Sequence, residues 1–480
     1  MVRNMKKILD MLLGKNESLR HTRNYMMGQI VNKGLGFLLI PITTALMSTV
    51  DYGTNSIFTS TVNIFVIILP LCIYKGVTRF HYDPQYDRKE ILGSEFLMMV
   101  IYMLGLGVTF ALTVNLWKDL AGLTVYLSML MLVHSFMQSI INFYLAYLQA
   151  HKRSSRYAVL SVAYGAGSTL LGVFWMSQMA TERYFGLIYS MLICRTIFAL
   201  IGTIDMWKDM RFTNNKKIRQ EIYRFCLPLI PHMISSFLLN YVDRYMIDEL
   251  VGTGESGLYS FAYNFGLIVN IVVQAINQTY NPEFYEMMNA KDYKRITNRI
   301  NMYQKGLLSI SACVVIFAAE AIMIWANPRY HAGISLVPMI CYGYILFHLY
   351  ATISAYSTYY KRNGYIAIVS IITSIINIIL NYIFIKQYGY GAAAYTTAFS
   401  YLIQYIICRL GNKYILKCQV HEMNSSLIRC LGFILLTYVG LGVISLLNIN
   451  ILLTIVVKFI LLVVTFGFIW QGELKHVYSK

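Results

Sequence analysis

Charged residues are scarce in this chain. Asp, Glu, Lys and Arg make up only 13% of its 480 residues, about half the share found in soluble domains. Hydrophobic residues account for 57%, which is more apolar surface than a water-soluble globule can bury. The composition therefore excludes an ordinary cytosolic enzyme and a secreted module, and it indicates that the protein lies in a bilayer.

Negative charge is the scarcer sign. Asp and Glu number 22 against 40 Lys and Arg, so the formal net charge is +18. In a soluble domain this excess would suggest nucleic acid. In a membrane protein the same excess is expected on the cytoplasmic loops, and we predict no nucleic-acid partner.

Several catalytic and metal motifs are missing. The eight cysteines include no C-x-x-C pair, and there is no G-x-x-x-x-G-K-[ST], H-E-x-x-H or G-x-S-x-G sequence, which excludes an ATP motor within the chain. His134, His232 and His348 lie in apolar segments without a carboxylate or cysteine at metal spacing. We therefore predict a non-enzyme with no cofactor and no metal.

Long apolar segments dominate the chain. A membrane span needs about 20 apolar residues, and the sequence predicts an all-α integral membrane protein with about 14 transmembrane helices and no soluble domain. The predicted spans are 25–47, 56–78, 94–115, 123–148, 157–176, 184–206, 225–247, 257–280, 306–325, 332–358, 365–385, 390–410, 428–447 and 450–471. Pro41 and Pro70 fall inside the first two spans and predict kinks.

Charge predicts the orientation. With the N-terminus inside, the inner segments hold 30 Lys and Arg residues, whereas the outer loops hold only Lys118, Arg183, Arg329 and Lys386. This asymmetry predicts that both termini are cytoplasmic. Basic and apolar residues alternate at helical spacing in the cytoplasmic segment 1–24, which predicts an amphipathic helix on the inner surface.

The basic segment 207–224 divides the predicted spans. Six spans precede it in an N-lobe, 25–206, and six follow in a C-lobe, 225–410. Residues 411–480 then hold a cytoplasmic loop, spans 13 and 14 and a cytoplasmic tail. Each group of six helices keeps the same membrane sense, which suits a parallel repeat with a substrate site between its halves.

Polar side chains recur at helical spacing within five spans. They could line a hydrated cavity or hydrogen-bond between packed helices, and for the whole set we favour the cavity. The stripes are Gln29, Asn32, Lys33 and Gly36; His134, Gln138, Asn142 and Gln149; His232, Ser236, Asn240, Asp243 and Arg244; Tyr263, Asn270, Gln274, Asn277 and Asn281; Ser370, Ser374, Asn377 and Asn381.

Cations outnumber carboxylates inside the predicted spans. We count Lys33, Lys75, Arg195, Arg244 and Lys458 against Asp243 and Glu320. Surplus cations in an apolar region attract an anion, although Lys75 and Arg244 could equally reach the interface by snorkelling. Asp243 and Arg244 are adjacent, so on a helix they point about 100° apart and need not pair. For Lys458 we expect a structural or lipid-headgroup role.

These patterns define the predicted site. Tyrosine rings can stack on the apolar faces of sugars while amides bind hydroxyls, although many of the 39 tyrosines must belong to interfacial belts. The predicted substrate-binding residues are Lys33, Lys75, Arg195, His232, Arg244, Tyr263, Asn270, Gln274 and Asn277. The candidates for coupling to an ion, H⁺ or Na⁺, are Asp243 and Glu320.

A series of short motifs runs through the second half of the chain. They are Leu227-Pro228-Leu229-Ile230-Pro231-His232, Asp243-Arg244-Tyr245-Met246-Ile247, Gly257-Leu258-Tyr259-Ser260, Asn281-Pro282-Glu283-Phe284, Asn377-Ile378-Ile379-Leu380-Asn381-Tyr382 and Gly391-Ala392-Ala393-Ala394. With them, the chain from about 20 to 410 resembles the bacterial polysaccharide transporters. These are lipid-linked repeat-unit flippases of the Wzx type, in the multidrug/oligosaccharidyl-lipid/polysaccharide exporter superfamily.

The resemblance implies two six-helix lobes in a V around a central cationic cavity, plus two extra C-terminal helices that guide a lipid tail. It implies alternating access that moves undecaprenyl-pyrophosphate-linked repeat units of O-antigen, capsule or exopolysaccharide from the inner to the outer leaflet of the bacterial cytoplasmic membrane. The partners would be membrane lipids and a complex of glycan polymerase and glycosyltransferases, and the transporter would work as a monomer.

The sequence leaves two other functions open. A multidrug exporter of the same superfamily usually places carboxylates in its lumen for cationic drugs, whereas the first span here carries Lys33 and no carboxylate. An integral-membrane polysaccharide polymerase or ligase usually needs a sizeable outer loop, and all the predicted outer loops are short.

Overall fold

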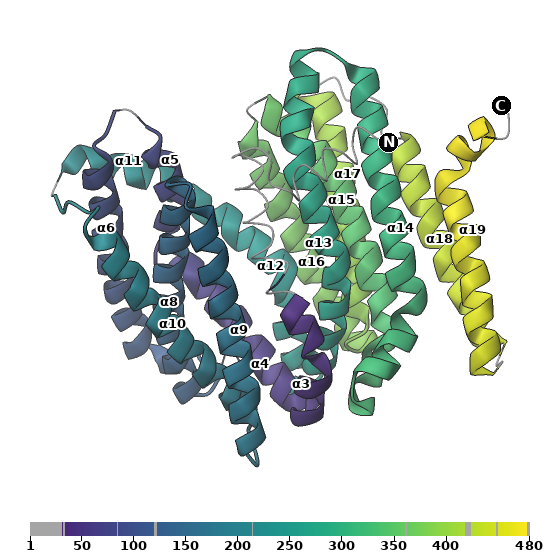
Figure 1. Cartoon of the computed structure of the whole chain (residues 1–480), viewed down its shortest axis with the longest axis horizontal. Helices are drawn as coiled ribbons and strands as arrows, with labels where there is room; N and C mark the ends of the chain where they lie inside the picture. Colours follow the sequence, from purple (N-terminus) through teal and green to yellow (C-terminus); the bar gives the residue numbers. More distant parts are fainter. Residues whose placement is uncertain are drawn as a thin grey trace. The chain divides into compact units, whose positions relative to one another are not determined.

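A computed structural model describes residues 31, 34–83, 85–119, 122–213, 215–360, 362–417, 424–447 and 450–477. The regular elements of these residues are all helical (Figure 1), which confirms the all-α membrane fold. The predicted amphipathic segment 1–24 and Lys33 lie outside the described residues.

The chain divides into two compact units between Phe237 and Leu238, within helix α12. Unit 1 contains α3 (Ile40–Leu46), α4 (Thr49–Ile68), η1 (Ile73–Lys75), α5 (Gly76–His81), α6 (Arg88–Leu112), α7 (Val114–Trp117), α8 (Val125–Ala150), α9 (Ser154–Gln178), α10 (Tyr184–Trp207), α11 (Lys216–Cys226) and the first half of α12 (Leu229–Leu250). Within it, α10 packs against α8 and α9, and α4 packs against α8.

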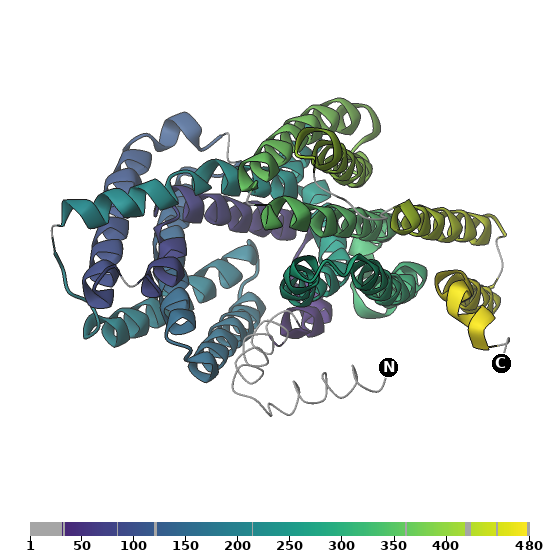
Figure 2. The same cartoon turned by 90° about the horizontal axis from the view of Figure 1, so that it is seen from above.

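Unit 2 contains the rest of α12, α13 (Thr253–Asn289), α14 (Tyr293–Trp325), η2 (Pro328–Leu336), α15 (Val337–Tyr359), α16 (Asn363–Tyr388), α17 (Ala392–Leu410), η3 (Gly411–Ile415), α18 (Asn424–Leu446) and α19 (Ile451–Val477). Its core is α15, which packs against α13 and α17. Helices α18 and α19 contact α14 and lie at the edge of the unit (Figures 1 and 2).

Eleven helices of the described residues are long and apolar enough to cross a membrane, and twelve are if the bent pair Thr49–Ile68 and Ile73–His81 counts as one span. The bend of 72° follows Pro70, where the sequence predicts a kink, because proline removes a hydrogen bond of the helix. The predicted span 390–410 forms α17, which is less apolar because it carries a polar face. The predicted span 25–47 is only partly described.

The basic segment 207–224 packs against unit 1. The backbone N–H of Arg211 donates to the Lys89 carbonyl over 2.8 Å, and α11 buries Ile218, Ile222 and Cys226. An amphipathic helix of this kind buries its apolar face against its neighbours, here α5 and α6. The segment therefore belongs to unit 1, and the boundary between the two compact units lies after it, within α12.

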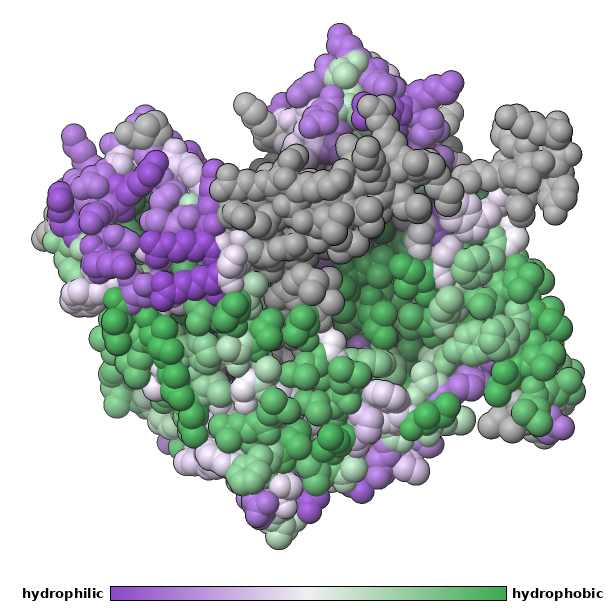
Figure 3. Space-filling view, in the orientation of Figure 1, coloured by the Kyte–Doolittle hydropathy of each residue, from purple (hydrophilic) through white to green (hydrophobic). Residues whose placement is uncertain are grey.

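Three segments predicted to lie on the inner side, 79–93, 149–156 and 207–224, meet at one end of unit 1. Tyr82 donates to the Ala150 carbonyl over 2.9 Å, Arg211 pairs with Asp87 at 3.1 Å, and Arg156 pairs with Asp205 at 2.9 Å. Figure 3 shows hydrophilic residues gathered over α5, α6 and α11, above a hydrophobic belt. This end of unit 1 therefore matches an aqueous surface next to a bilayer.

Candidate functional site

Arg195 lies near the middle of α10 and is only 7% exposed. Its Nη1 lies 2.7 Å from Nδ1 of His134 on α8, and its Nε donates to the Tyr164 hydroxyl on α9 over 3.0 Å. Within the described part of the chain, no carboxylate forms an ion pair with it. Three helices of unit 1 thus hold a buried guanidinium through neutral groups alone.

The hydrogen bonds continue from Arg195 along α8. The Tyr164 hydroxyl donates to Oε1 of Gln138 over 3.2 Å, and Nε2 of Gln138 donates to Oδ1 of Asn142 over 2.9 Å. Tyr164 also lines a cavity of about 200 Å³ with Tyr144, Tyr157, Ser161 and hydrophobic residues. A positive charge, an amide chain and a hydroxyl-lined cavity therefore lie together in unit 1.

The other predicted residues of unit 1 lie elsewhere. Lys75 ends η1 at the bend between α4 and α5, and its exposed ammonium lies 5.2 Å from the ring centre of Tyr74. His232 is half-buried on α12, and among the described residues its Nδ1 has no hydrogen-bond partner.

Asp243 and Arg244 form a buried cluster in unit 2. Although they are neighbours on α12, Nη1 of Arg244 lies 3.4 Å from Oδ1 of Asp243, so the long arginine side chain turns back to the carboxylate. The Tyr259 hydroxyl donates to Oδ2 of Asp243 over 2.5 Å. The guanidinium carbon lies 4.5 Å from the ring centre of Tyr263, a cation–π contact. The sequence left open whether these two charges pair, and in the structure they do.

The predicted glycan residues of α13 separate in the structure. Tyr263 is buried against Arg244. Asn270 and Asn277 are half-buried and Gln274 is exposed, with Nε2 of Gln274 lying 3.4 Å from Oδ1 of Asn270. The three amides therefore share a partly open face of α13, whereas the tyrosine points into the unit.

The polar side chains of α16 form hydrogen bonds with α17. The amide of Asn377 donates to Ser400 over 3.2 Å, and Thr396 donates to Oδ1 of Asn381. Both asparagines are fully buried. For this stripe the structure therefore shows helix–helix hydrogen bonding instead of a cavity lining.

Glu320 and Lys458 pair with each other. The Lys458 ammonium lies 2.7 and 2.9 Å from the two carboxylate oxygens of Glu320, and the side chains are 7% and 19% exposed, respectively. The contact joins α19 to α14, so it ties the last predicted span to the main body of unit 2.

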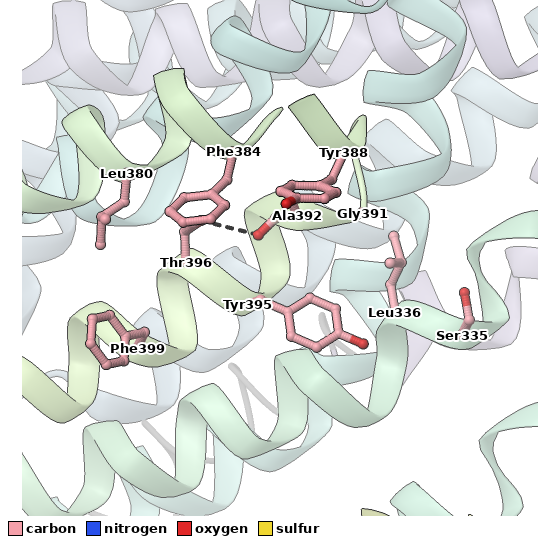
Figure 4. A pocket seen from close by; sticks show the side chains of 10 residues that line it. All are labelled: Ser335, Leu336, Leu380, Phe384, Tyr388, Gly391, Ala392, Tyr395, Thr396 and Phe399. Carbon is pink, nitrogen blue, oxygen red and sulfur yellow. Dashed lines mark hydrogen bonds between the residues drawn. The ribbon is translucent and has the colours of Figure 1, made fainter. Parts of the chain in front are cut away.

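An apolar cavity of about 630 Å³ lies in unit 2, between η2 and the facing ends of α16 and α17. Figure 4 shows Phe384 and Tyr388 of α16 on one side and Tyr395 and Phe399 of α17 on the other. No charged side chain of the described residues lines it. Its lining suits a hydrocarbon chain and not an ionic headgroup.

Two ionisable residues were missed by the sequence analysis. Arg429 lies on α18 and donates to Asn301 and to Gln304, each over 3.0 Å. Glu95 is the second residue of the predicted span 94–115 but is not among the carboxylates counted there; α6 begins at Arg88, and the carboxyl is buried. The early helix start could have been found from Asp87, whose side chain caps the helix by accepting from the Lys89 N–H over 3.1 Å.

Known proteins resemble this chain in sequence. Residues 18–288 match the family described as "Polysaccharide biosynthesis protein". The "Lsg locus putative protein 1" of Haemophilus influenzae is 24% identical over 73% of this chain and 87% of its own length. An "Uncharacterized membrane protein" of the same organism is 22% identical over 65% of this chain and 76% of its own length.

Solved structures share the fold. The lipid II flippase MurJ, in an inward closed conformation, superposes with a TM-score of 0.69 at 15% identity and covers 95% of this chain and all of its own. An inward-facing multidrug resistance MATE transporter of the MOP superfamily gives 0.63 at 11% identity, over 82% of this chain and 96% of its own. The predicted resemblance is confirmed: this multi-pass membrane protein belongs to the polysaccharide biosynthesis protein family and has the fold of the MOP superfamily.

Proposed function

We propose that the protein is a flippase that moves lipid-linked oligosaccharide repeat units from the inner to the outer leaflet of a bacterial cytoplasmic membrane by alternating access. Family membership and the shared fold support transport of a polysaccharide precursor. The substrate would be an undecaprenyl-pyrophosphate-linked unit of O-antigen, capsule or exopolysaccharide.

The observation that carries the proposal is the uncompensated guanidinium of Arg195. A buried charge is costly unless it is paired, yet its partners are His134 and Tyr164, which are neutral or repel a cation. An anionic pyrophosphate would supply the missing charge, since arginine binds phosphate oxygens in a bidentate geometry. The amides of Gln138 and Asn142 next to it would bind hydroxyl groups.

The remaining predicted residues keep proposed roles. Lys75 and the basic inner segments would concentrate the headgroup at the entrance. Lys33, which lies outside the described residues, would act with Arg195 to offset part of the headgroup's desolvation cost. The amides of Asn270, Gln274 and Asn277 on the partly open face of α13 would bind sugars, and the cluster of Arg244 and Tyr263 would support that helix from within. An alkyl tail would lie along apolar surfaces such as the cavity in Figure 4.

The direct test uses purified full-length protein in vesicles that contain lipid-linked oligosaccharide extracted from a producing strain. Moving one negative charge out of a negative interior gains about 2.3 kcal/mol per 100 mV, so we expect the flipping rate to rise with an inside-negative potential. No flipping under any condition would overturn the proposal. In cells, deletion should strand lipid-linked units on the inner leaflet, whereas single units stranded outside would indicate a polymerase.

The proposed orientation has its own test. A cysteine at Lys386 should react with an impermeant thiol reagent from outside, whereas one at Lys217 should react only after the membrane is opened; both side chains are exposed. The native cysteines are first replaced, because Cys313 is also exposed. Labelling of position 217 in intact cells would overturn the cytoplasmic placement of the segment 207–224.

A further inference from the structure

Glu95 is the most isolated acidic side chain in the described part of unit 1. It lies about two turns inside α6 and is 1% exposed. Its Oε1 is buried without a hydrogen bond, and no ion pair to it forms among the described residues. A carboxylate buried in this way would pay the full cost of desolvation, so the group is expected to carry a proton.

The carboxyl lies at the edge of a cavity of about 140 Å³. The cavity is also lined by His81 of α5, Arg88 and Lys89 of α6, His151 at the end of α8, and Asp209 after α10. These residues come from the three predicted inner segments that meet at the hydrophilic end of unit 1 (Figure 3). The cavity therefore connects the buried acid with the side of unit 1 that faces the proposed inner aqueous phase.

The other acid of this cavity is poorly suited to carry a proton. The Tyr147 hydroxyl donates to Oδ2 of Asp209 over 2.6 Å, and Lys89 lies 3.7 Å from its Oδ1. The hydrogen bond from Tyr147 is the main cause that lowers the pKa of Asp209. Asp209 is therefore ionised at neutral pH, and Glu95 is the acid of this cavity whose charge can change.

Gly76 leaves room for the Glu95 carboxyl because it has no side chain. A Cβ at Gly76 would lie 2.4 Å from its Oε1, well inside contact distance, so a side chain at position 76 would displace the carboxyl. Cys226 of α11 is a buried thiol near this carboxyl. From η1, Lys75 is exposed and lies over the ring of Tyr74, so it does not neutralise the carboxyl.

We propose that Glu95 is a proton-binding site that exchanges its proton with the inner aqueous phase through this cavity and couples that exchange to the transport cycle. The coupling rests on the proposed flippase function, whereas proton binding does not. With its proton, the neutral carboxyl is stable in the closed site. Without its proton, the carboxylate would need water and the cations Arg88 and Lys89 to stabilise its charge. It could reach them only if the site were more open.

Infrared spectroscopy of the purified full-length protein in lipid tests proton binding directly. At neutral pH the wild type should show the C=O stretch of a protonated carboxylic acid, which disappears on alkaline titration. Glu95→Gln should lose this band. Glu221→Gln should keep it, because the side chain of Glu221 on α11 is 42% exposed and does not line this cavity. A wild type without the band, or a band that survives Glu95→Gln, would overturn the proposal.

A second variant covers the case in which Glu95→Gln does not fold. Gly76→Ala keeps the carboxyl but displaces it, so the frequency of the band should shift. Gly105→Ala is the matched control, because a Cβ there would meet nothing within 4 Å. An unshifted band in Gly76→Ala would contradict the proposed site.

Flipping assays in the same vesicles test the coupling. An imposed pH difference should change the wild-type flipping rate, and this response should be lost in Glu95→Gln and kept in Glu221→Gln. If the wild type flips lipid without any response to the pH difference, the coupling is wrong. If the wild type does not flip lipid at all, the proposed function fails, and the infrared result still decides whether Glu95 binds a proton.

Discussion

The two units treat their buried charges differently. In unit 2, Asp243 pairs with Arg244 and Glu320 pairs with Lys458, so these two carboxylates each meet a cation, although Arg429 of the same unit is bound by the neutral Asn301 and Gln304. In unit 1, Arg195 is bound by neutral partners, and Glu95 has no partner among the described residues. Because an unpaired buried charge is costly, natural chains keep one chiefly where a ligand or proton completes it.

Under the proposed function, the paired and the unpaired charges have different tasks. The paired charges of unit 2 satisfy each other and mainly hold helices together, as Glu320 and Lys458 hold α14 to α19. The unpaired groups of unit 1 have electrostatic capacity left for a transported anion or a proton. Substitutions that remove single charges can break or sharpen this comparison.

The largest loss of stability is expected for Arg244→Ala. It leaves the Asp243 carboxylate buried without its cation, which should lower the free energy of unfolding by about 3–5 kcal/mol. Thermal unfolding in detergent measures the change. The exposed Arg224 on α11 provides the control, because Arg224→Ala should stay within about 0.5 kcal/mol. Equal effects of the two variants would remove the distinction between a structural pair and a surface charge.

Lys458→Ala should follow, with a loss of about 3 kcal/mol, because it strands Glu320 beside α19. Replacing both partners in Glu320→Leu/Lys458→Leu should restore most of that loss, since two apolar side chains satisfy each other in a membrane. Unfolding of the wild type, the single variant and the double variant gives the coupling. If the double variant is as unstable as the single one, the pair is not the contact that stabilises α19.

A smaller loss is expected for Asn381→Ala in the closed stripe between α16 and α17. The change leaves the Thr396 hydroxyl and the Asn377 amide without Asn381, at a cost of about 1–3 kcal/mol. Asn270→Ala on the open face of α13 should change stability by less than about 0.5 kcal/mol and still reduce flipping. An Asn270→Ala variant with wild-type flipping would remove that face from the proposed site.

Arg195→Gln should combine a small effect on stability with the largest effect on transport. No opposite charge is left unpaired, so the free energy of unfolding should fall by about 1 kcal/mol or less. Flipping should be lost, because the proposed anion site has lost its cation. Glycan export is measured together with the protein level in membrane immunoblots. If export falls only in proportion to the protein level, Arg195 has a structural role.

Sequence analysis could find Arg195 but not its surroundings. Depth within a span marked it as a cation in an apolar region, and helical spacing placed His134, Gln138 and Asn142 on one face. Tyr164 comes from another helix, and spacing along one helix cannot predict contacts between helices. Glu95 was missed because hydropathy places the end of a span only to within a few residues, whereas its burial depends on where α6 begins.

The polar stripe of α16 also shows that spacing along one helix does not predict contacts between helices. A run of Ser and Asn at helical spacing has the same pattern whether it faces water or a neighbouring helix. Only the packing of α17 against α16 decided that Asn377 and Asn381 bind Thr397, Ser400 and Thr396. On α13 the same kind of pattern leaves Gln274 exposed.

The sequence by itself determined the solvent of this protein, its all-helical architecture and its family, because apolar length, charge bias and local motifs are properties of single segments. It also named most of the charged side chains that are buried within these helices. Tertiary structure alone decided which of these charges are neutralised. Ion pairing depends on distances of a few ångströms between side chains on different helices, or on how one long side chain folds back, as Arg244 does onto Asp243. Neither is encoded in the spacing of residues along the chain.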